Sequence, residues 1–525
     1  MKHKIHNSFL KSILPAVSFG ALTGILTSVV INLYKVCAKY AISFSEKGYH
    51  YISEHLYLIP IALLAFLIPA FIFAIIYKRI PNLRGGGIPT SIGILRGIIA
   101  FKWIRNLVGI FSMSLVSFLV GVPLGNEGPS VQMGVAIGRG SVFSFGQKHH
   151  VWDRYSMTGG ACSGFAVATG APISGVLFAI EEAHQRISPM ILMLASISVM
   201  FATMTTELIA PILGVSRTLF PAMELPTLTL REAWIPLAVG AAVGLFAVLF
   251  LRYYQLIFGF FNKTLSRIPH AWRIFMVFSL TFIAGLFSYS FISTGHELIL
   301  HLLSGETTLL MLLMLLIVRS TLTLCANSNR ITGGIFLPLM AVGALVSAIV
   351  AKLFSFLGFD GSYCTVILVL GIIACIAGMM KMPLTAIVFA VEALSCYDNV
   401  IYVIITAGVA YLITEIFSAE SINDRVLENR VDEINKGKTS TVIDRYVTVC
   451  PGSFAVGMQV RDIFWPNGVF VLSHKHTLPI DTRDKHAAKA IHERDVLHIR
   501  CTTFDEKHTE EKLKLIIGDW DNLTK

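Results

Sequence analysis

Long apolar segments dominate the chain up to about residue 420. A helix needs about 20 apolar residues to cross a bilayer, and several segments reach or approach that length. They are Phe9–Ser43, Leu56–Tyr77, Phe101–Val120, Met190–Leu213, Trp234–Leu251, Ile274–Ser293, Leu309–Cys325 and Leu339–Leu357. This pattern predicts a bundle of membrane-spanning helices.

Shorter apolar segments, interrupted by glycine and proline, lie between the long ones. They are 88–98, Gly128–Phe145, Tyr155–Thr169, Pro172–Ala183, Val366–Met380, Pro383–Ala393 and Val400–Ile416. Short, interrupted hydrophobic segments are typical of transporters whose binding site is built from discontinuous helices. From about Glu428 onward the residues become charged and alternate with period two, which predicts a small soluble segment at the end of the chain.

The composition supports a polytopic membrane protein. Of the 525 residues, 54% are hydrophobic and 14% are charged, whereas roughly 25% of residues are charged in a soluble domain. The net charge of +10 fits lysine and arginine retained on cytoplasmic loops, and no basic run has the aromatic spacing of a nucleic-acid site. The eight cysteines form no Cys-x-x-Cys pair, so the sequence indicates neither disulfides nor a metal site.

One ionisable residue stands out within the apolar region. The stretch Gly125–Pro129 reads Gly-Asn-Glu-Gly-Pro and lies between two apolar segments. An ionisable residue at membrane depth is a functional-site hypothesis by default, and Pro129 suits the first turn of a new helix. We therefore expect Glu127 at a helix start inside the membrane. The alternative is a loop carboxylate at the lipid–water boundary.

The chain also contains an internal repeat, with halves at about 50–215 and 230–430. Gly125–Pro129, with a glycine five residues later, matches Gly334–Pro338, which is also followed by a glycine at the same distance. Further on, Ala171–Glu181 matches Met382–Glu392. Two matches in the same order indicate duplication, although the sequence alone does not determine whether the repeat is inverted.

Three chain breaks, before Pro89, Pro129 and Pro338, each place glycines ahead of a helix. Helix N-termini are natural anion sites because their first N–H groups are unpaired. If the three helix starts converge, the transported species is an anion.

These motifs resemble the CLC family of chloride channels and chloride/proton antiporters, over roughly residues 10–430. The family's Gly-Ser-Gly-Ile-Pro motif corresponds to Gly85–Pro89, its Gly-Arg/Lys-Glu-Gly-Pro motif to Gly125–Pro129, and its Gly-x-Phe-x-Pro motif to Gly334–Pro338. The resemblance implies an all-α polytopic membrane fold with an inverted repeat, a homodimer, and one anion pathway in each subunit. It also implies a transporter with no enzymatic activity and no cofactor.

The resemblance further implies residue roles. Glu127 is expected to be the external gating glutamate, whose carboxylate occupies an anion site until it is protonated. Glu182 matches the internal proton-transfer glutamate of the antiporter branch. Its alternative role is a helix-end carboxylate paired with His184 or Arg186 at the cytoplasmic surface. The expected anion-binding residues are Gly86, Gly87, Ile88, Asn126, Ile335, Phe336 and Asn423.

Three of these positions depart from the family pattern. Gly86 stands where chloride-selective members have serine, Asn126 where a basic residue is usual, and Asn423 where a tyrosine is expected. Nitrate-preferring and fluoride-exporting relatives also lack the serine, whereas Phe336 is retained as in the chloride branch. Chloride is therefore the default anion, with fluoride and nitrate open. Within the same class, the alternative to a proton-coupled antiporter is a passive anion channel.

Residues 437–515 are expected to form a small α/β cytoplasmic domain. Strands are predicted at Tyr446–Cys450, Val469–Ser473 and Val496–Cys501, with a short helix at Lys485–Glu493. The layout resembles the C-terminal regulatory domain of bacterial potassium-uptake proteins, which implies a ligand-sensing or dimerising module. The alternative is a stabilising domain without a ligand. The whole chain is expected to be a multi-pass protein of a bacterial inner membrane.

Two other classes of function are disfavoured. An intramembrane protease would need two histidines on one helix face around a glutamate, but His296 and His301 are five residues apart. Glu181 and His184 have di-metal spacing, yet the second repeat half has no matching histidine. A receptor role would leave the intramembrane Glu127 unexplained.

Overall fold

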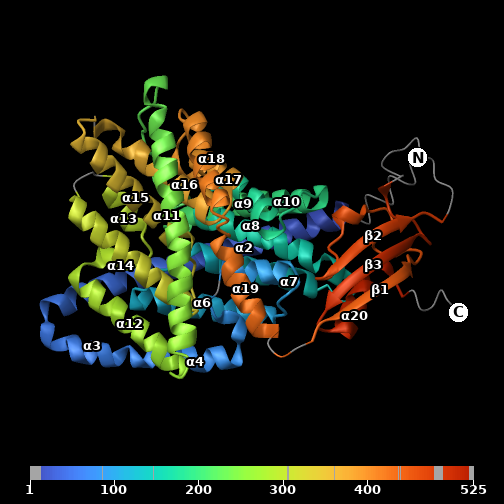
Figure 1. Ribbon diagram of the computed structural model, residues 1–525. Coiled ribbons are helices and arrows are strands. Elements are labelled where there is room, and N and C mark those ends of the chain that lie inside the picture. Colours follow the sequence, from blue (N-terminus) through green and yellow to red (C-terminus); the bar gives the residue numbers. More distant parts are fainter. Residues whose placement is uncertain are drawn as a thin grey trace.

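The computed structural model describes residues 13–519 except 86, 146, 304–306, 360, 436, 438 and 478–488. It contains a large helical body, to which a small mixed sheet-and-helix unit is attached at one end (Figure 1). Within the described residues, nine helices are long and apolar enough to cross a membrane. The protein is therefore a multi-pass membrane protein, as the hydrophobic pattern predicts.

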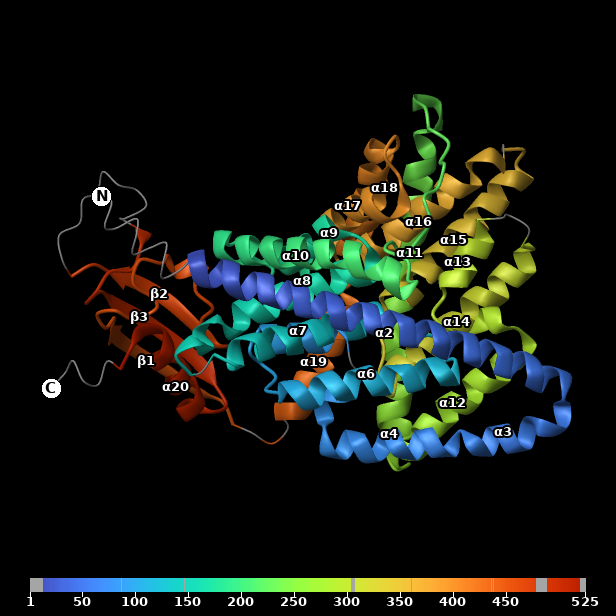
Figure 2. The same cartoon turned by 180° about the vertical axis from the view of Figure 1, so that it is seen from behind.

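The first part of the helical body holds one very long helix and eight others. They are α2 (Leu14–Glu54), α3 (Ile59–Ala65), α4 (Leu67–Arg79), α5 (Ile88–Leu95), α6 (Trp103–Val120), α7 (Glu127–Phe143), α8 (Asp153–Thr169), α9 (Pro172–Phe178) and α10 (Pro189–Leu213). Helices α2, α8 and α10 pack against one another and run side by side (Figure 2). Phe9, where the first apolar segment begins, lies outside the described residues, and α2 extends beyond Ser43 because the sequence that follows is still amphipathic.

The second part repeats the same order of elements. It comprises α11 (Trp234–Gly259), α12 (His270–Phe287), α13 (His296–Leu302), α14 (Leu309–Ser328), α15 (Phe336–Phe356), α16 (Cys364–Met379), α17 (Pro383–Leu394), α18 (Val400–Ile416) and α19 (Ile422–Asn435). The short helices α5, α9 and α17 each begin with proline at the first or second position. Proline ends the preceding segment and fits the start of the next one, which explains why the helices are discontinuous.

The repeat is visible in how equivalent helices pack. In the first half α7 packs on α8, and in the second half α15 packs on α16. A Cβ at Gly134 of α7 would lie 2.0 Å from the carbonyl oxygen of Gly160 in α8, and a Cβ at Gly343 of α15 would lie 2.6 Å from that of Gly371 in α16. Small residues allow such close approach of membrane helices. The glycine shared by the two sequence motifs therefore has the same packing role in both halves.

The second pair of motifs forms reciprocal helix caps. The carboxylate of Glu181 accepts the N–H groups of Leu384 (2.8 Å) and Thr385 (2.7 Å) at the start of α17. The carboxylate of Glu392, at the equivalent position, accepts the N–H groups of Ile173 (2.7 Å) and Ser174 (2.8 Å) at the start of α9. Each repeat half thus caps a helix of the other. Together with the antiparallel pairing described below, this exchange indicates a pseudo-twofold relation between the two halves, as expected of an inverted repeat.

The C-terminal unit is a three-stranded antiparallel sheet of order β1-β3-β2. Its elements are β1 (Thr441–Thr448), β2 (Val469–Lys475), β3 (Val496–Thr503) and α20 (Glu506–Ile517). The three strands confirm the predicted α/β character. Residues 485–488 of the predicted helix lie outside the described residues, and the described residues 489–493 form no α-helix. Helix α20, whose apolar face packs on the sheet core through Leu513, Ile516 and Ile517, was not predicted.

One loop of the C-terminal unit docks on the helical body. Phe464 lies against His184 with ring centroids 4.6 Å apart, and the guanidinium groups of Arg154 and Arg186 stand 4.7 and 5.0 Å from the centre of its ring. Arg154 also donates a 2.6 Å hydrogen bond to the carbonyl of Trp465. The docking loop, residues 460–467, therefore meets the end of the helical body that carries Glu182.

Candidate functional site

The helix starts of the two repeat halves meet in the interior of the protein. Gly125, just before α7, and Gly334, just before α15, form an isolated antiparallel bridge. The Gly125 N–H donates to the Gly334 carbonyl at 2.6 Å, and the Gly334 N–H donates to the Gly125 carbonyl at 2.8 Å. These two residues are aligned with each other in the sequence repeat. The glycine–proline motifs of the two repeat halves are therefore bonded to each other.

The third helix start lies beside the other two. Gly87 precedes α5, and a Cβ there would lie 3.0 Å from the Cα of Gly128. A Cβ at Gly128 would in turn lie 2.7 Å from the Cα of Gly334. The starts of α5, α7 and α15 therefore converge, and their positive dipole ends favour negative charge at the point where they meet.

Glu127 lies at this convergence. It is the first residue of α7 and is 0% exposed, and neither carboxylate oxygen has a hydrogen-bond partner among the described residues. A Cβ at Gly125 would lie 2.4 Å from Oε2, so the side chain folds back over its own loop. The backbone N–H groups of Glu127 and of Leu337, in the first turn of α15, lie near the carboxylate, although neither meets the geometry of a hydrogen bond. A buried carboxylate thus lies among backbone amides of both halves.

The predicted residues on α15 line the same convergence. Ile335 caps α15 and is 4% exposed, and Phe336 begins the helix and is fully buried. The ring of Phe336 meets Phe165 of α8 edge-on at 5.1 Å and Phe389 of α17 at 5.8 Å. This aromatic cluster fixes the start of α15, whose first N–H groups have no intrahelical acceptor.

The predicted residues around α5 and α7 differ in burial and in whether their backbone groups already have hydrogen-bond partners. The Gly87 N–H donates to the side-chain oxygen of Gln132 at 2.6 Å, so that amide already has a partner. Ile88 begins α5 and is buried. Asn126 caps α7 through its backbone carbonyl, which accepts both the N–H and the hydroxyl of Ser130. Gly86 lies outside the described residues.

Glu182 is buried at a second place. It lies in the π-helical turn η5 (Ala179–Ala183) that follows α9, and it is 2% exposed. Its Oε1 accepts a 2.8 Å hydrogen bond from the side-chain amide of Asn423, the second residue of α19. Asn423 is fully buried, and its Oδ1 has no partner among the described residues. The structure thus places Asn423 next to Glu182.

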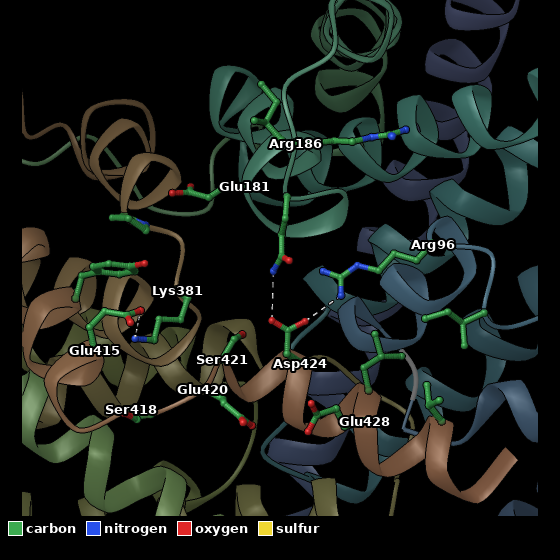
Figure 3. Close-up of a pocket in the computed structure, with 18 of the residues that line it drawn as sticks. Arg96, Glu181, Arg186, Lys381, Glu415, Ser418, Glu420, Ser421, Asp424 and Glu428 are labelled. Carbon is green, nitrogen blue, oxygen red and sulfur yellow. Dashed lines mark hydrogen bonds and ion pairs between the residues drawn. The ribbon is translucent and has the colours of Figure 1, made fainter. Parts of the chain in front are cut away.

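A water-accessible cavity of about 1230 Å³ flanks this pair. Its lining includes Glu181 on one side of Glu182, and Ser421 and Asp424 on either side of Asn423. Figure 3 shows Asp424 facing Arg96. The Arg96 guanidinium lies 3.2 Å from one oxygen of Asp424, and the side-chain amide of Gln185 donates a 3.3 Å hydrogen bond to the other. Six carboxylates and three cationic side chains line the cavity, namely Glu181, Glu415, Glu420, Asp424, Glu428 and Asp432 with Arg96, Arg186 and Lys381. We call this the acidic vestibule.

Residues 69–415 match the family described as voltage gated chloride channel. This chain belongs to the CLC family. The match covers well over half of the chain, which is enough to establish membership, and members of this family are transporters rather than enzymes.

Individual relatives agree with this membership. The chain is 25% identical over 436 residues to the H(+)/Cl(-) exchange transporter ClcA of Vibrio vulnificus, covering 78% of this chain and 89% of that protein. It is 26% identical over 432 residues to the protein of the same name from Klebsiella pneumoniae, covering 80% of this chain and 89% of that protein.

Solved structures share the fold. A slow cyanobacterial Cl⁻/H⁺ antiporter matches with a TM-score of 0.70 at 24% identity, over 80% of this chain and 99% of the other. A CLC-type fluoride/proton antiporter matches with a TM-score of 0.64 at 18% identity, over 77% and 96%. At these identities the likeness establishes the fold alone. The CLC fold predicted from the three motifs is confirmed.

Sequence reasoning missed three features of the site. It did not identify Gln132 as the partner of the Gly87 N–H, and it considered Glu181 only as a metal ligand. It also did not anticipate that Asn423 would bond Glu182. Glu181 had a usable signal, because its repeat mate Glu392 is identical. Gln132 and Asn423 had none, since their contacts join segments far apart in sequence.

Proposed function

We propose that this protein is a proton-coupled anion antiporter of the CLC type, with chloride as the default anion. The observation that carries the proposal is the position of Glu127, which is buried where helix starts of both repeat halves meet and has no hydrogen-bond partner among the described residues. A carboxylate in an anion site is itself a tethered anion. Its protonation removes the charge that the backbone amides stabilise, so the side chain leaves and a mobile anion takes its place.

Glu182 is proposed to pass protons between the acidic vestibule and the interior. Its carboxylate is bound by Asn423 rather than by a cation. The two groups that a surface role would need are engaged elsewhere, because His184 Nε2 lies 2.8 Å from Thr158 Oγ1 and Arg186 donates to the carbonyl of Ile463. The excess of carboxylates in the vestibule attracts protons and repels anions. These contacts favour proton transfer over a purely structural carboxylate.

The anion-binding set is proposed to be Gly86, Gly87, Ile88, Asn126, Ile335, Phe336 and Asn423. Three of them lack the hydroxyl or cationic donors that chloride-selective members use, namely Gly86, Asn126 and Asn423. Fluoride and nitrate therefore remain candidate substrates. A fluoride/proton antiporter among the structural neighbours fits the first of these, whereas the ClcA relatives favour chloride.

The arrangement in the cell is part of the same proposal. Residues 1–430 form the transport domain of a homodimer in a bacterial inner membrane, with repeat halves at about 50–215 and 230–430. Residues 437–515 form a regulatory-type domain on the cytoplasmic side, because the docking loop contacts the vestibule end of the helical body. Any ligand of that domain is unidentified, and its likeness to the potassium-uptake regulatory domain remains a hypothesis.

The deciding experiment measures proton uptake into proteoliposomes under a chloride gradient alone, repeated with fluoride and with nitrate. We expect uphill proton movement with at least one of these anions, and the anion that drives it fastest is the substrate. We also expect Glu127→Gln to give anion flux that is insensitive to pH and moves no protons, because its side chain cannot ionise. Anion flux without proton movement in the parent protein would instead support the passive-channel alternative.

A further inference from the structure

Three histidines and one aspartate converge in the C-terminal unit, away from the transport site. His474 Nε2 lies 2.7 Å from Asp495 Oδ2, and His476 Nδ1 lies 2.9 Å from the same oxygen. His492 Nδ1 lies 3.7 Å from it. His474, His476 and Asp495 each offer one potential metal-ligand atom, and these three atoms lie within 4.8 Å of one another. Three metal-ligating side chains therefore surround one point, and His492 lies beside them, within 3.7 Å of the shared carboxylate oxygen.

The backbone explains why these side chains meet. His474 is the second-last residue of strand β2, and His476 follows it by two residues. Residues i and i+2 of an extended chain face the same side. His492 and Asp495 lie three residues apart in the turn that leads into β3, and β2 pairs with β3 so that His474 lies opposite Leu497. The sheet register therefore brings both pairs to one end of the sheet.

The surroundings suit a bound cation. The side chain of Asp495 is 1% exposed, while those of His474, His476 and His492 are 15%, 27% and 36% exposed, so the cluster is reachable from solvent but has a buried carboxylate. His492 Nδ1 is buried and has no hydrogen-bond partner among the described residues. An unsatisfied buried ring nitrogen beside a carboxylate is costly, and a metal bond would satisfy it.

We propose that His474, His476, His492 and Asp495 form a binding site for Zn²⁺ or a similar divalent transition metal. Imidazole nitrogen and carboxylate oxygen are the donors that Zn²⁺ takes in four-coordinate sites, with bonds of about 2.0–2.1 Å. Ligand atoms around such an ion stand roughly 3.3 Å apart, which follows from the tetrahedral angle and those bond lengths. When the ion enters, the distances from Asp495 Oδ2 to His474 Nε2 and to His476 Nδ1 lengthen by about half an ångström. The 3.7 Å distance from the same oxygen to His492 Nδ1 shortens.

Neighbouring groups hold the carboxylate in place for this role. The backbone N–H of His492 donates to Asp495 Oδ2 at 2.7 Å, and the backbone N–H of Thr477 donates to Oδ1 at 3.4 Å. Hydrogen bonds of this kind orient metal ligands and are part of a site's affinity. The four ligands come from the two chain segments that flank residues 478–488. Metal binding therefore ties the end of β2 to the turn before β3.

The rival account is a cluster held by hydrogen bonds alone, in which the histidines donate to Asp495 and no ion is needed. Burial alone raises the pKa of Asp495, but hydrogen bonds from His474, the His492 amide and His476 outweigh burial, so its pKa is below the usual value. The aspartate therefore stays ionised across the physiological range. Both accounts predict an ionised carboxylate, so only metal binding itself separates them.

The test uses the full-length protein in detergent, purified without a polyhistidine tag and stripped with a chelator. Co²⁺ is titrated in while its visible absorption is followed, and Zn²⁺ is then added to displace it. We expect one strong tetrahedral Co²⁺ spectrum per chain, displaced by Zn²⁺, and one zinc per chain by elemental analysis. His476→Ala, which removes one ligand, is expected to weaken binding on the order of 100-fold, the upper end of what loss of an outer-shell partner costs, and Asp495→Asn to weaken it likewise.

The matched control is His498→Ala. His498 lies on β3 of the same sheet but pairs with Asp444 outside the cluster, so this variant should bind Co²⁺ like the parent. Absence of a tetrahedral Co²⁺ spectrum in the parent would overturn the proposal in favour of the hydrogen-bonded cluster. So would equal metal content in the parent, His476→Ala and Asp495→Asn proteins. Because every readout is metal binding, failure here leaves the transport proposal intact, and the reverse also holds.

Discussion

Glu127 and Glu182 are both buried carboxylates, but their partners differ. Glu127 has no hydrogen-bond partner among the described residues, whereas Glu182 accepts the amide of Asn423. A buried carboxylate is costly to keep charged when no cation is in ion-pair contact with it, and neither has such a contact among the described residues, so both are suited to carry a proton. Their positions also differ: Glu127 lies among the backbone amides of two repeat halves, and Glu182 is next in the chain to Glu181, which lines the acidic vestibule.

The first prediction concerns Glu182→Gln. The amide side chain keeps the size of the glutamate and can still pair with Asn423, but it cannot carry a proton at physiological pH. We expect proton uptake into proteoliposomes to fall to the background rate while anion flux persists. The control is Glu428→Gln, which removes a vestibule carboxylate that faces Arg425 at 3.4 Å. Equal proton flux in the Glu182→Gln protein and the parent would rule out the proton-transfer role.

A second prediction concerns Asn423→Leu. This variant removes the hydrogen bond to Glu182 in a fully buried position and adds an apolar side chain of similar size. The glutamate then becomes harder to ionise, because a buried carboxylate loses its only donor among the described residues. We expect proton transport to slow at least several-fold, and more strongly as the pH falls, because the harder-to-ionise carboxyl then keeps its proton. A proton flux with the parent's rate and pH dependence would show that Asn423 does not act on Glu182.

At the scale of elements, the exchange of caps between halves determines how α9 and α17 are held. A carboxylate that accepts backbone N–H groups at a helix start contributes about 1–2 kcal/mol to stability. Glu392 bonds two amides and the hydroxyl of Ser174 at the start of α9. Glu181 makes the equivalent bonds to Leu384 and Thr385. The two halves are therefore locked to each other near the site.

We accordingly predict that Glu392→Ala and Glu181→Ala lower the free energy of unfolding by similar amounts, about 1–2 kcal/mol each. The measurement is thermal or denaturant unfolding of the purified protein in detergent. Glu297→Ala is the control, since that side chain is 81% exposed beside His296. A stability loss in only one of the two variants would mean that the caps are not equivalent.

The elements also show what the sequence could and could not reveal. The spans and the repeat were predictable because apolar length and duplicated motifs are local signals, and they led to the CLC fold. The Gly125–Gly334 bridge was not predictable in detail. The alignment equated the two residues, but equivalence in sequence does not imply contact in space. Helix α20 was missed because its charged residues mask the apolar face formed by Leu513, Ile516 and Ile517.

At the scale of the whole molecule, the C-terminal unit and the helical body meet through the docking loop. Phe464 inserts its ring among Arg154, Arg186 and His184. His184 is two residues from Glu182 along the chain. The docking loop is therefore joined to Glu182, the proposed proton-transfer residue, through one short segment of protein.

The last prediction is that Phe464→Ala loosens this docking. Truncating a buried phenylalanine costs about 3–5 kcal/mol, so we expect lower thermal stability and faster hydrogen exchange in residues 460–467. The matched control is Phe470→Ala, because Phe470 lies on β2 with 65% of its surface exposed. Exchange rates in the docking loop that match those of the parent would show that Phe464 does not hold the two parts together.

The paired backbone bonds between Gly125 and Gly334 have a consequence for the proposed gating step. They hold the loop that carries Glu127 against the opposite repeat half, so the backbone around the carboxylate is kept in place. If Glu127 leaves the amides as proposed, a rotation of its side chain is enough, without the domain motions that take microseconds to milliseconds. The proposed gating step therefore needs no separation of the two repeat halves.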